Sequence, residues 1–150
     1  HRTQGLPVVI LRLFLVYGPG QGNNRFLPQV INGCISGLNF PASKGNQYRD
    51  FCYVDDISKG ILLALNSKKS EGEVINLASG IPISIREVIE LVKKNVGMGS
   101  PNFGKISYRV GENMNLYADI TKAKKLLKWA PSISIEDGIR QTINFQISKK

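Results

Sequence analysis

The sequence predicts an α/β fold, because segments typical of buried strands alternate with segments typical of amphipathic helices. Residues 7–14 form an apolar run rich in β-branched residues, as expected of a buried, parallel strand. A loop rich in glycine and asparagine follows over residues 17–24, and apolar residues then recur at helical spacing over residues 25–38. The chain therefore opens with a predicted strand–loop–helix unit.

The middle of the chain continues this alternation. The pattern becomes short and extended around Phe40, and residues 45–54 then lead to Asp55 and Asp56. Either of these is a natural N-cap for an apolar helix over residues 57–65. Helix capping explains these two carboxylates better than a paired acid/base site does. Residues 73–77 predict a further short strand.

Sequence patterns typical of helices dominate the rest of the chain. Ser84 and Glu87 have the spacing of a capping box, and Gly97 ends the helix that they open. A loop rich in glycine, serine and proline is expected over residues 97–104, with an extended segment after it over residues 106–110.

Two further helices are expected near the C-terminus. Asp119 or Thr121 is predicted to cap a helix that runs through Leu127. Ser134 is predicted to open the last helix, along which isoleucines recur four residues apart.

Composition excludes several classes of protein. The 150 residues are 42% hydrophobic and 21% charged, which suits one folded domain, and no apolar run approaches the roughly 18–20 residues that span a bilayer. Cys34 and Cys52 are too few for a disulfide framework, and the only histidine is residue 1, so His/Cys metal sites and histidine-based triads are not expected. We expect a cytoplasmic protein that does not bind membranes. Because the chain lacks an initiator methionine, we also expect a fragment whose upstream part is missing.

The net charge of +9 favours an anionic partner only where the basic residues are suitably placed. Most lysines fall on predicted helix faces, where solvation is the simplest explanation. Four arginines instead stand singly beside turn or aromatic residues, a placement that suits phosphate binding: Arg12, Arg25, Arg49 and Arg109.

The glycine loop after the first strand does not fit a dinucleotide-binding fingerprint. Gly18 and Gly20 match the first two glycines, but the third position is Asn23. No Asp or Glu follows before Asp50, so the expected ribose-binding acid is absent. We therefore do not predict cofactor binding at this loop.

Four sequence blocks, in order, resemble the C-terminal half of the NAD-dependent epimerase/dehydratase family, the extended short-chain dehydrogenases that act on nucleotide sugars. The resemblance covers essentially all 150 residues. The blocks are RLFLVYGPG at 12–20, QYRDFCYVDD at 47–56, NLASG at 76–80, and RVG at 109–111 with Asp119, Lys122 and LKWAP at 127–131.

This resemblance implies that residues 1–150 are the C-terminal substrate-binding region of an extended Rossmann-type enzyme, with the last parallel strands and a small mixed α/β subdomain. The family's dinucleotide-binding region and its Tyr-x-x-x-Lys couple are expected upstream. No tyrosine here is followed four residues later by lysine, so no catalytic residue is assigned and the chain alone is expected to be inactive. NAD or NADP would be bound mainly by the missing region, and the full-length enzyme is expected to be a homodimer.

The resemblance also implies roles for individual residues. Arg49 and Arg109 match the arginines that bracket the diphosphate of the sugar nucleotide, although Arg49 could instead pair with Asp50 or Asp55 and tie a loop. Phe26, Leu27 and Pro28 fall where the family packs the nucleobase and the ribose edge, with ordinary helix core as the alternative for Phe26 and Leu27. Asn76 matches a strand-end asparagine, for which a buried, turn-forming role is an equal explanation.

Leu15 departs from the family pattern. Many members have Asn or Ser at this position, where the polar side chain helps to hold the sugar or phosphate of the substrate. Leucine cannot donate a hydrogen bond, so either Asn23 or Asn24 takes over this role, or the substrate differs from the commonest type.

The predicted function is therefore the substrate-binding half of an NAD(P)-dependent nucleotide-sugar epimerase, dehydratase or 4-ketoreductase, which holds the diphosphate so that hydride transfer occurs at C4 of the sugar. A non-catalytic nucleotide-sugar-binding module is the main alternative. A basic nucleic-acid-binding domain is suggested by the charge alone, but aromatic and basic residues do not interleave as such a surface requires, and nucleic acid is not an expected partner.

Overall fold

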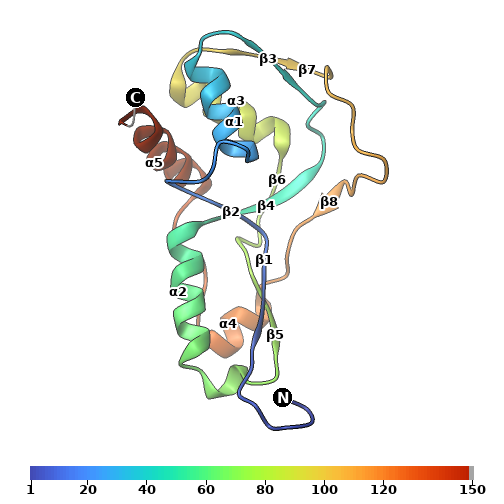
Figure 1. Cartoon of the computed structure of the whole chain (residues 1–150), viewed down its shortest axis with the longest axis vertical. Helices are drawn as coiled ribbons and strands as arrows, with labels where there is room; N and C mark the ends of the chain where they lie inside the picture. Colours follow the sequence, from blue (N-terminus) through green and yellow to red (C-terminus); the bar gives the residue numbers. More distant parts are fainter. Residues whose placement is uncertain (149–150) are drawn as a thin grey trace.

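Parallel strand pairs and a small mixed sheet organise the chain, which a computed structural model describes over residues 1–148 (Figure 1). The strands are β1 (Ile10–Leu13), β2 (Leu15–Tyr17), β3 (Asn39–Ala42), β4 (Tyr48–Tyr53), β5 (Val74–Leu77), β6 (Pro82–Ser84), β7 (Ser100–Phe103) and β8 (Asn115–Leu116). The helices are α1 (Phe26–Ile35), α2 (Val54–Leu65), the short 3₁₀ helix η1 (Lys68–Ser70), α3 (Ile85–Val96), α4 (Thr121–Leu127) and α5 (Ile135–Ser148).

The N-terminal end of the elongated molecule is built around the parallel pair of β1 and β5, with α2 and α4 beside it (Figure 1). Its core includes Ile57 from α2, Ile75 and Leu77 from β5, and Trp129. The indole N–H of Trp129 donates to the carbonyl oxygen of Asp56 at 2.9 Å, which satisfies the polar edge of the buried ring.

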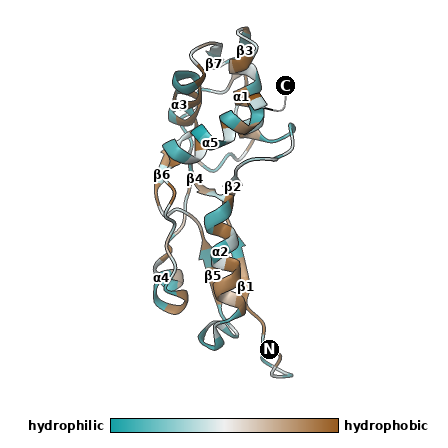
Figure 2. Ribbon diagram, turned by 90° about the vertical axis from the view of Figure 1, so that its left-hand side faces the viewer, coloured by the Kyte–Doolittle hydropathy of each residue, from teal (hydrophilic) through white to brown (hydrophobic). Residues whose placement is uncertain are grey.

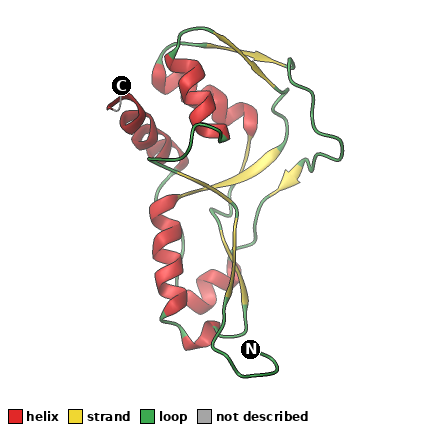
Figure 3. Cartoon of the chain, viewed as in Figure 1, coloured by secondary structure: helices red, strands yellow, loops and turns green. Residues whose placement is uncertain are grey.

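The opposite end consists of α1, α3 and α5 with the parallel pair of β3 and β7 (Figures 1 and 3). Helix α3 contacts both α1 and α5, and its apolar face is buried at Val88, Ile89 and Val92. These residues share one core with Ile31 of α1 and Ile139 of α5.

Strand β4 connects the two ends. It pairs in parallel with β2 and β8 and antiparallel with β6, and α2 begins immediately after it. Because side chains alternate along a strand, β4 sends successive residues to opposite faces of this sheet. The strand therefore determines where Arg49, Asp50 and Phe51 point.

Several local signals are confirmed. Ser84 accepts a hydrogen bond from the Glu87 backbone N–H while the Glu87 carboxylate accepts from the Ser84 backbone, which completes the predicted capping box of α3. Gly97 ends this helix with φ of +79°, a left-handed conformation that glycine adopts without strain. The Ser134 hydroxyl accepts from the Asp137 N–H at 3.1 Å at the start of α5.

The predicted strand over residues 7–14 is wrong in two respects. It divides at Phe14 into β1 and β2, because β1 pairs with β5 whereas β2 pairs with β4. It is also not buried throughout: Ile10 is 59% and Leu13 46% exposed, since β5 is the one strand that flanks β1 within residues 1–148. Figure 2 shows the hydrophobic colouring of β1.

The extended segment predicted over residues 106–110 is also wrong. The strand lies earlier, at β7, within the predicted Gly/Ser/Pro loop, and residues 106–110 form no strand. Pairing with β3, in the register Asn39 to Ser100, supplies backbone hydrogen bonds that override the weak local preference of this segment.

The expected capping by Asp55 or Asp56 is not observed. Helix α2 begins at Val54, and its N-cap, Tyr53, makes no side-chain cap bond. The buried Asp56 carboxylate instead accepts hydrogen bonds from the Ser132 hydroxyl and from the N–H groups of Ser132 and Ile133. At α4 the prediction is closer, since Asp119 accepts from the Thr121 N–H at 2.8 Å.

Candidate functional site

A cavity of about 780 Å³ opens where β2, the start of α1 and the end of β4 meet. Its lining combines two chemically different groups of side chains. The apolar group is Phe14, Leu15, Val16, Phe26, Leu27, Phe51 and Val54, with Tyr17 at its edge. The polar group is Gln21, Asn24, Arg25 and Arg109, which line the cavity together with Gly18, Pro19 and Gly20. The cavity therefore suits a ligand with both an apolar or aromatic part and an anionic part.

Four aromatic rings form or support the apolar wall. The ring of Tyr17 meets Phe51 edge-on, with centroids 6.1 Å apart, and meets Tyr53 at 5.6 Å. Phe26 lies 6.0 Å from Phe51. Burial raises the pKa of Tyr17 well above its ordinary value, so this hydroxyl stays protonated and the wall carries no charge.

Glycine at two positions allows this arrangement. A Cβ at Gly18 would lie 2.5 Å from Val54 Cγ1, so only glycine lets the loop after β2 approach the start of α2. A Cβ at Gly138 would lie 2.2 Å from the Tyr17 hydroxyl, so glycine lets α5 pack against this tyrosine. Both glycines serve packing around the aromatic wall.

Two cations face the cavity without a competing acid. The side chains of Arg25 and Arg109 are exposed and, within the part of the chain that the structure describes, make no ion pair. The Gln21 side chain is already hydrogen-bonded within the protein, because its amide donates to the Val16 carbonyl at 2.9 Å. The two free guanidinium groups make this end of the cavity electropositive.

The structure brings some of the predicted site residues together and separates others. Phe26, Leu27 and Arg109 line the cavity, and so does Leu15. Pro28 is buried in the first turn of α1 and does not line the cavity.

Asn76 also lies outside the cavity lining. Its side-chain amide donates to the Asp119 carbonyl at 3.0 Å and so links β5 to the segment before α4. Asn76 is half-buried and lies within β5, so it is not the buried, turn-forming residue of the alternative.

Arg49 lies on β4 and is tied to the segment before β8. One guanidinium nitrogen donates to the carbonyls of Tyr48 and Asn113, both at 2.7 Å, and the other forms an ion pair with Glu112. Neither Asp50 nor Asp55 is the partner that the alternative suggested. Direct contact between Arg49 and a diphosphate stays a prediction.

Sequence reasoning did not assign several cavity-lining residues to the site, among them Tyr17, Phe51 and Arg25. Tyr17 and Phe51 form the aromatic wall, and Arg25 adds a second cation beside Phe26. Arg25 can be recognised in the sequence as a candidate phosphate-binding residue, because it is one of the four isolated arginines. Tyr17 and Phe51 had no such signal, because alternation along a strand does not reveal which face borders a cavity.

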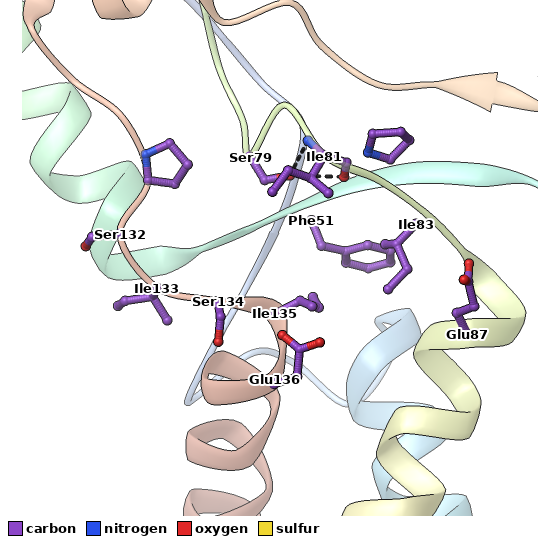
Figure 4. A pocket seen from close by; sticks show the side chains of 12 residues that line it. Phe51, Ser79, Ile81, Ile83, Glu87, Ser132, Ile133, Ser134, Ile135 and Glu136 are labelled. Carbon is purple, nitrogen blue, oxygen red and sulfur yellow. Dashed lines mark hydrogen bonds between the residues drawn. The ribbon is translucent and has the colours of Figure 1, made fainter.

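A second cavity, of about 560 Å³, lies on the other side of Phe51, between the starts of α3 and α5 (Figure 4). Its floor is apolar, with Ile83, Ile133 and Ile135, while Glu87 and Glu136 are the charged residues that line it. Its acidic lining disfavours an anionic ligand, so we assign the candidate site to the first cavity.

The described residues offer no metal-binding cluster, and their glycine loop is only partly open. Residues 1–148 contain no group of three His, Cys, Asp or Glu side chains that could hold a metal ion. In the loop after β2, Gly18 lies against Val54, whereas the space beside Gly20 is open. None of the helices over the same range is long and apolar enough to cross a membrane.

Comparison with known proteins places the chain in a family. Residues 1–78 match the model of the NAD dependent epimerase/dehydratase family. The chain is 37% identical to UDP-glucuronate 4-epimerase of Thermodesulfobacterium geofontis over 151 aligned residues, covering 97% of this chain and 45% of the relative. It is 28% identical to a dTDP-glucose 4,6-dehydratase of Actinoplanes sp., covering 95% of this chain and 45% of that protein.

Solved structures lead to the same family. UDP-glucuronic acid 4-epimerase from Bacillus cereus, in complex with UDP-glucuronic acid and NAD, matches with a TM-score of 0.89 and 35% identity, covering 100% of this chain and 48% of that one. The chain thus spans about half the length of the relatives that it matches, and the predicted mixed α/β fold with parallel strands is confirmed. The chain belongs to the NAD-dependent epimerase/dehydratase family.

Proposed function

We propose that this chain forms the nucleotide-sugar-binding part of an NAD(P)-dependent epimerase or dehydratase, and that the cavity between β2, α1 and β4 holds the nucleotide diphosphate. The observation that carries this proposal is that one cavity combines an apolar, aromatic wall with Arg25 and Arg109, neither of which forms an ion pair within residues 1–148. Solved relatives named as complexes with UDP-glucuronic acid or UDP-glucose support the ligand class.

Each part of such a ligand has a chemical counterpart in the cavity. Arg109 and Arg25 supply charge-assisted hydrogen bonds to phosphate oxygens, and the planar base packs against Phe26 and Leu27. Leu15 adds an apolar surface and no donor, so polar contacts to the sugar must come from residues such as Asn24. Burial of the apolar wall and fixed cations together favour one orientation of the ligand.

The contribution of this chain is binding and orientation. Because no tyrosine of this chain is followed four residues later by lysine, we assign the redox chemistry to an NAD(P)-binding part of the complete protein. In that protein, the residues described here would hold the sugar nucleotide so that the reacting carbon faces the cofactor.

Binding of UDP to the complete protein tests the proposal, with calorimetry as the measurement. Arg109→Ala should weaken UDP binding roughly tenfold to 100-fold, the effect of losing a charge-assisted hydrogen bond to phosphate, and should leave NAD binding unchanged. Arg140→Ala is the matched control, because Arg140 is exposed, pairs with Asp137 and lies outside the cavity lining.

Three results would contradict the proposal. Equal UDP affinity in wild type and Arg109→Ala would remove the cavity as the diphosphate site. Tight binding of single-stranded oligonucleotide with a steep salt dependence, and none of UDP, would favour the nucleic-acid alternative. UDP binding without any NAD-dependent turnover by the complete protein would favour the non-catalytic module.

A further inference from the structure

The second cavity shares Phe51 with the proposed nucleotide site but has no part in the proposed function. Its volume of about 560 Å³ lies within the range of about 300–1,000 Å³ that is typical of small-molecule pockets. Its apolar lining comprises Phe51, two prolines and the four isoleucines Ile81, Ile83, Ile133 and Ile135. The Ile81 side chain is 69% exposed, so a ligand with an apolar body would remove hydrophobic surface from water here.

One carboxylate at this cavity is not engaged by the protein. Glu136 lies in the first turn of α5 and lines the cavity, and its side chain makes no hydrogen bond or ion pair within residues 1–148. Arg140, one turn further along α5, pairs with Asp137 at 2.6 Å instead. The Glu136 carboxylate is therefore available to a ligand.

A second carboxylate, that of Glu87 from α3, is only half used. Its Oε2 accepts hydrogen bonds from both the backbone N–H and the hydroxyl of Ser84, at 2.8 and 2.6 Å. Its Oε1 accepts none from the residues that the structure describes. The bonds from Ser84 lower the pKa of Glu87, so this side chain is ionised at neutral pH. Figure 4 shows Glu87 and Glu136 on two different helices, with Phe51 and Ile83 beside them.

The other polar side chains of the lining present acceptors rather than donors. Three serines line the cavity, and each donates its hydroxyl hydrogen to an aspartate. The pairs are Ser79 with Asp50 at 2.7 Å, Ser132 with Asp56 at 2.8 Å, and Ser134 with Asp137 at 2.9 Å. No lysine, arginine or histidine of residues 1–148 lines the cavity, although the whole sequence has a net charge of +9. The lining side chains therefore complement a ligand that donates hydrogen bonds and carries positive charge.

From these observations we infer that the second cavity binds an organic cation, an ammonium group on a compact apolar body. The ammonium group meets Glu136 and the free oxygen of Glu87, and the apolar body covers Phe51 and the isoleucines. Charge-assisted hydrogen bonds orient such a ligand, and burial of apolar surface adds affinity. The inference does not depend on the proposed function, because it concerns a different cavity and a ligand of the opposite charge.

Two probes of similar shape and opposite charge test this inference. Tryptamine and indole-3-propionate each carry an indole ring on a two-carbon chain, which ends in an ammonium group in the first and a carboxylate in the second. Calorimetric titration of the complete protein at pH 7, with and without UDP, compares their affinities. Tryptamine should bind about tenfold more tightly or better, because only the ammonium group can donate to the two carboxylates.

Substitutions separate the contribution of charge from that of apolar contact. Glu136→Gln removes a charge at an exposed position without a partner in the described chain, so it should preserve the fold and weaken tryptamine binding by about tenfold. Glu90→Gln, at an exposed position of α3 outside the lining, is the matched control and should change the affinity by less than about twofold. Ile81→Ser should weaken tryptamine binding roughly threefold, because the ligand then covers less apolar surface.

The results distinguish this site from the nucleotide site. Equal affinities for the two probes, equal tryptamine affinities in Glu136→Gln and Glu90→Gln, or no tryptamine binding at millimolar concentration would overturn the inference and leave the proposed function standing. Loss of tryptamine binding on addition of UDP would place the amine in the nucleotide cavity and would also overturn it. Tryptamine binding that depends on Glu136, in a protein that does not bind UDP, would support the inference and contradict the proposed function alone.

Discussion

The carboxylate of Asp50 accepts hydrogen bonds from both the backbone N–H and the hydroxyl of Ser79, at 2.6 and 2.7 Å. Its second oxygen accepts from the N–H groups of Gly80 and Ala118. Asp50 is fully buried, and no cation pairs with it within residues 1–148. This one side chain therefore joins β4 to the turn after β5 and to the segment that precedes α4.

Asp50→Ala should destabilise the protein by about 3 kcal/mol or more, because four donors lose their acceptor in a buried site. Asp50→Asn should cost less, since its amide oxygen can still accept some of these bonds. Urea denaturation measures the free energy of unfolding. The control is Asp55→Ala, at an exposed position on α2, which should change stability by no more than about 0.5 kcal/mol. Equal effects of Asp50→Ala and Asp55→Ala would contradict this role.

The capping box of α3 should make stability depend on pH. Hydrogen bonds from the Ser84 hydroxyl and backbone N–H lower the pKa of Glu87. A carboxyl whose pKa is lower in the folded state stabilises the fold above its unfolded pKa, and this contribution is lost as the pH falls through the folded pKa.

Wild type should thus exceed Glu87→Gln in stability at pH 7, and the difference should shrink toward zero in acid below the folded pKa of Glu87. Ser84→Ala should cost about 1 kcal/mol at neutral pH. Thermal unfolding at a series of pH values measures both effects. Glu90→Gln, on the same helix and exposed, is the control for loss of charge alone, and an identical pH profile for the two glutamine variants would refute the prediction.

The two cysteines should be unreactive in the folded protein. Burial raises the pKa of the Cys52 thiol to about 12, and burial also raises that of Cys34. Because the thiolate is the nucleophile, alkylation by iodoacetamide at pH 8 should be slow until the protein unfolds. Leu65→Cys, at a position that is 73% exposed, should by contrast be labelled quickly. Rapid labelling of Cys52 under native conditions would mean that β4 opens easily.

The 150-residue chain studied alone should self-associate. Ile10 and Leu13 on β1 are 59% and 46% exposed, on a strand that pairs on one side only within the described residues. An exposed apolar edge strand is a template for pairing with another chain. The double substitution of Ile10→Lys and Leu13→Lys should lower the fraction of protein that sediments as aggregate and the binding of a hydrophobic dye. Leu38→Lys, at an exposed position outside β1, should have little effect on either measurement. A monomeric wild-type chain with a sharp, cooperative melt would contradict this prediction.

Part of the candidate site follows from local sequence. The glycine loop, the helix after it and the isolated arginines all lie within short windows, and Phe26, Leu27 and Arg109 do line one cavity. The strand at β7 could not be predicted in this way, because it depends on pairing with β3, far away along the chain.

What the sequence by itself determined is therefore local: the alternation of strands and helices, the capping box at Ser84, and the helix end at Gly97 each depend on residues a few positions apart. Only the tertiary structure decided the partner of Arg49, which is Glu112, 63 residues away along the chain, rather than its neighbour Asp50. The physical reason is that adjacent residues of β4 point to opposite faces of the sheet, so Arg49 meets the segment before β8 while Asp50 turns into the core.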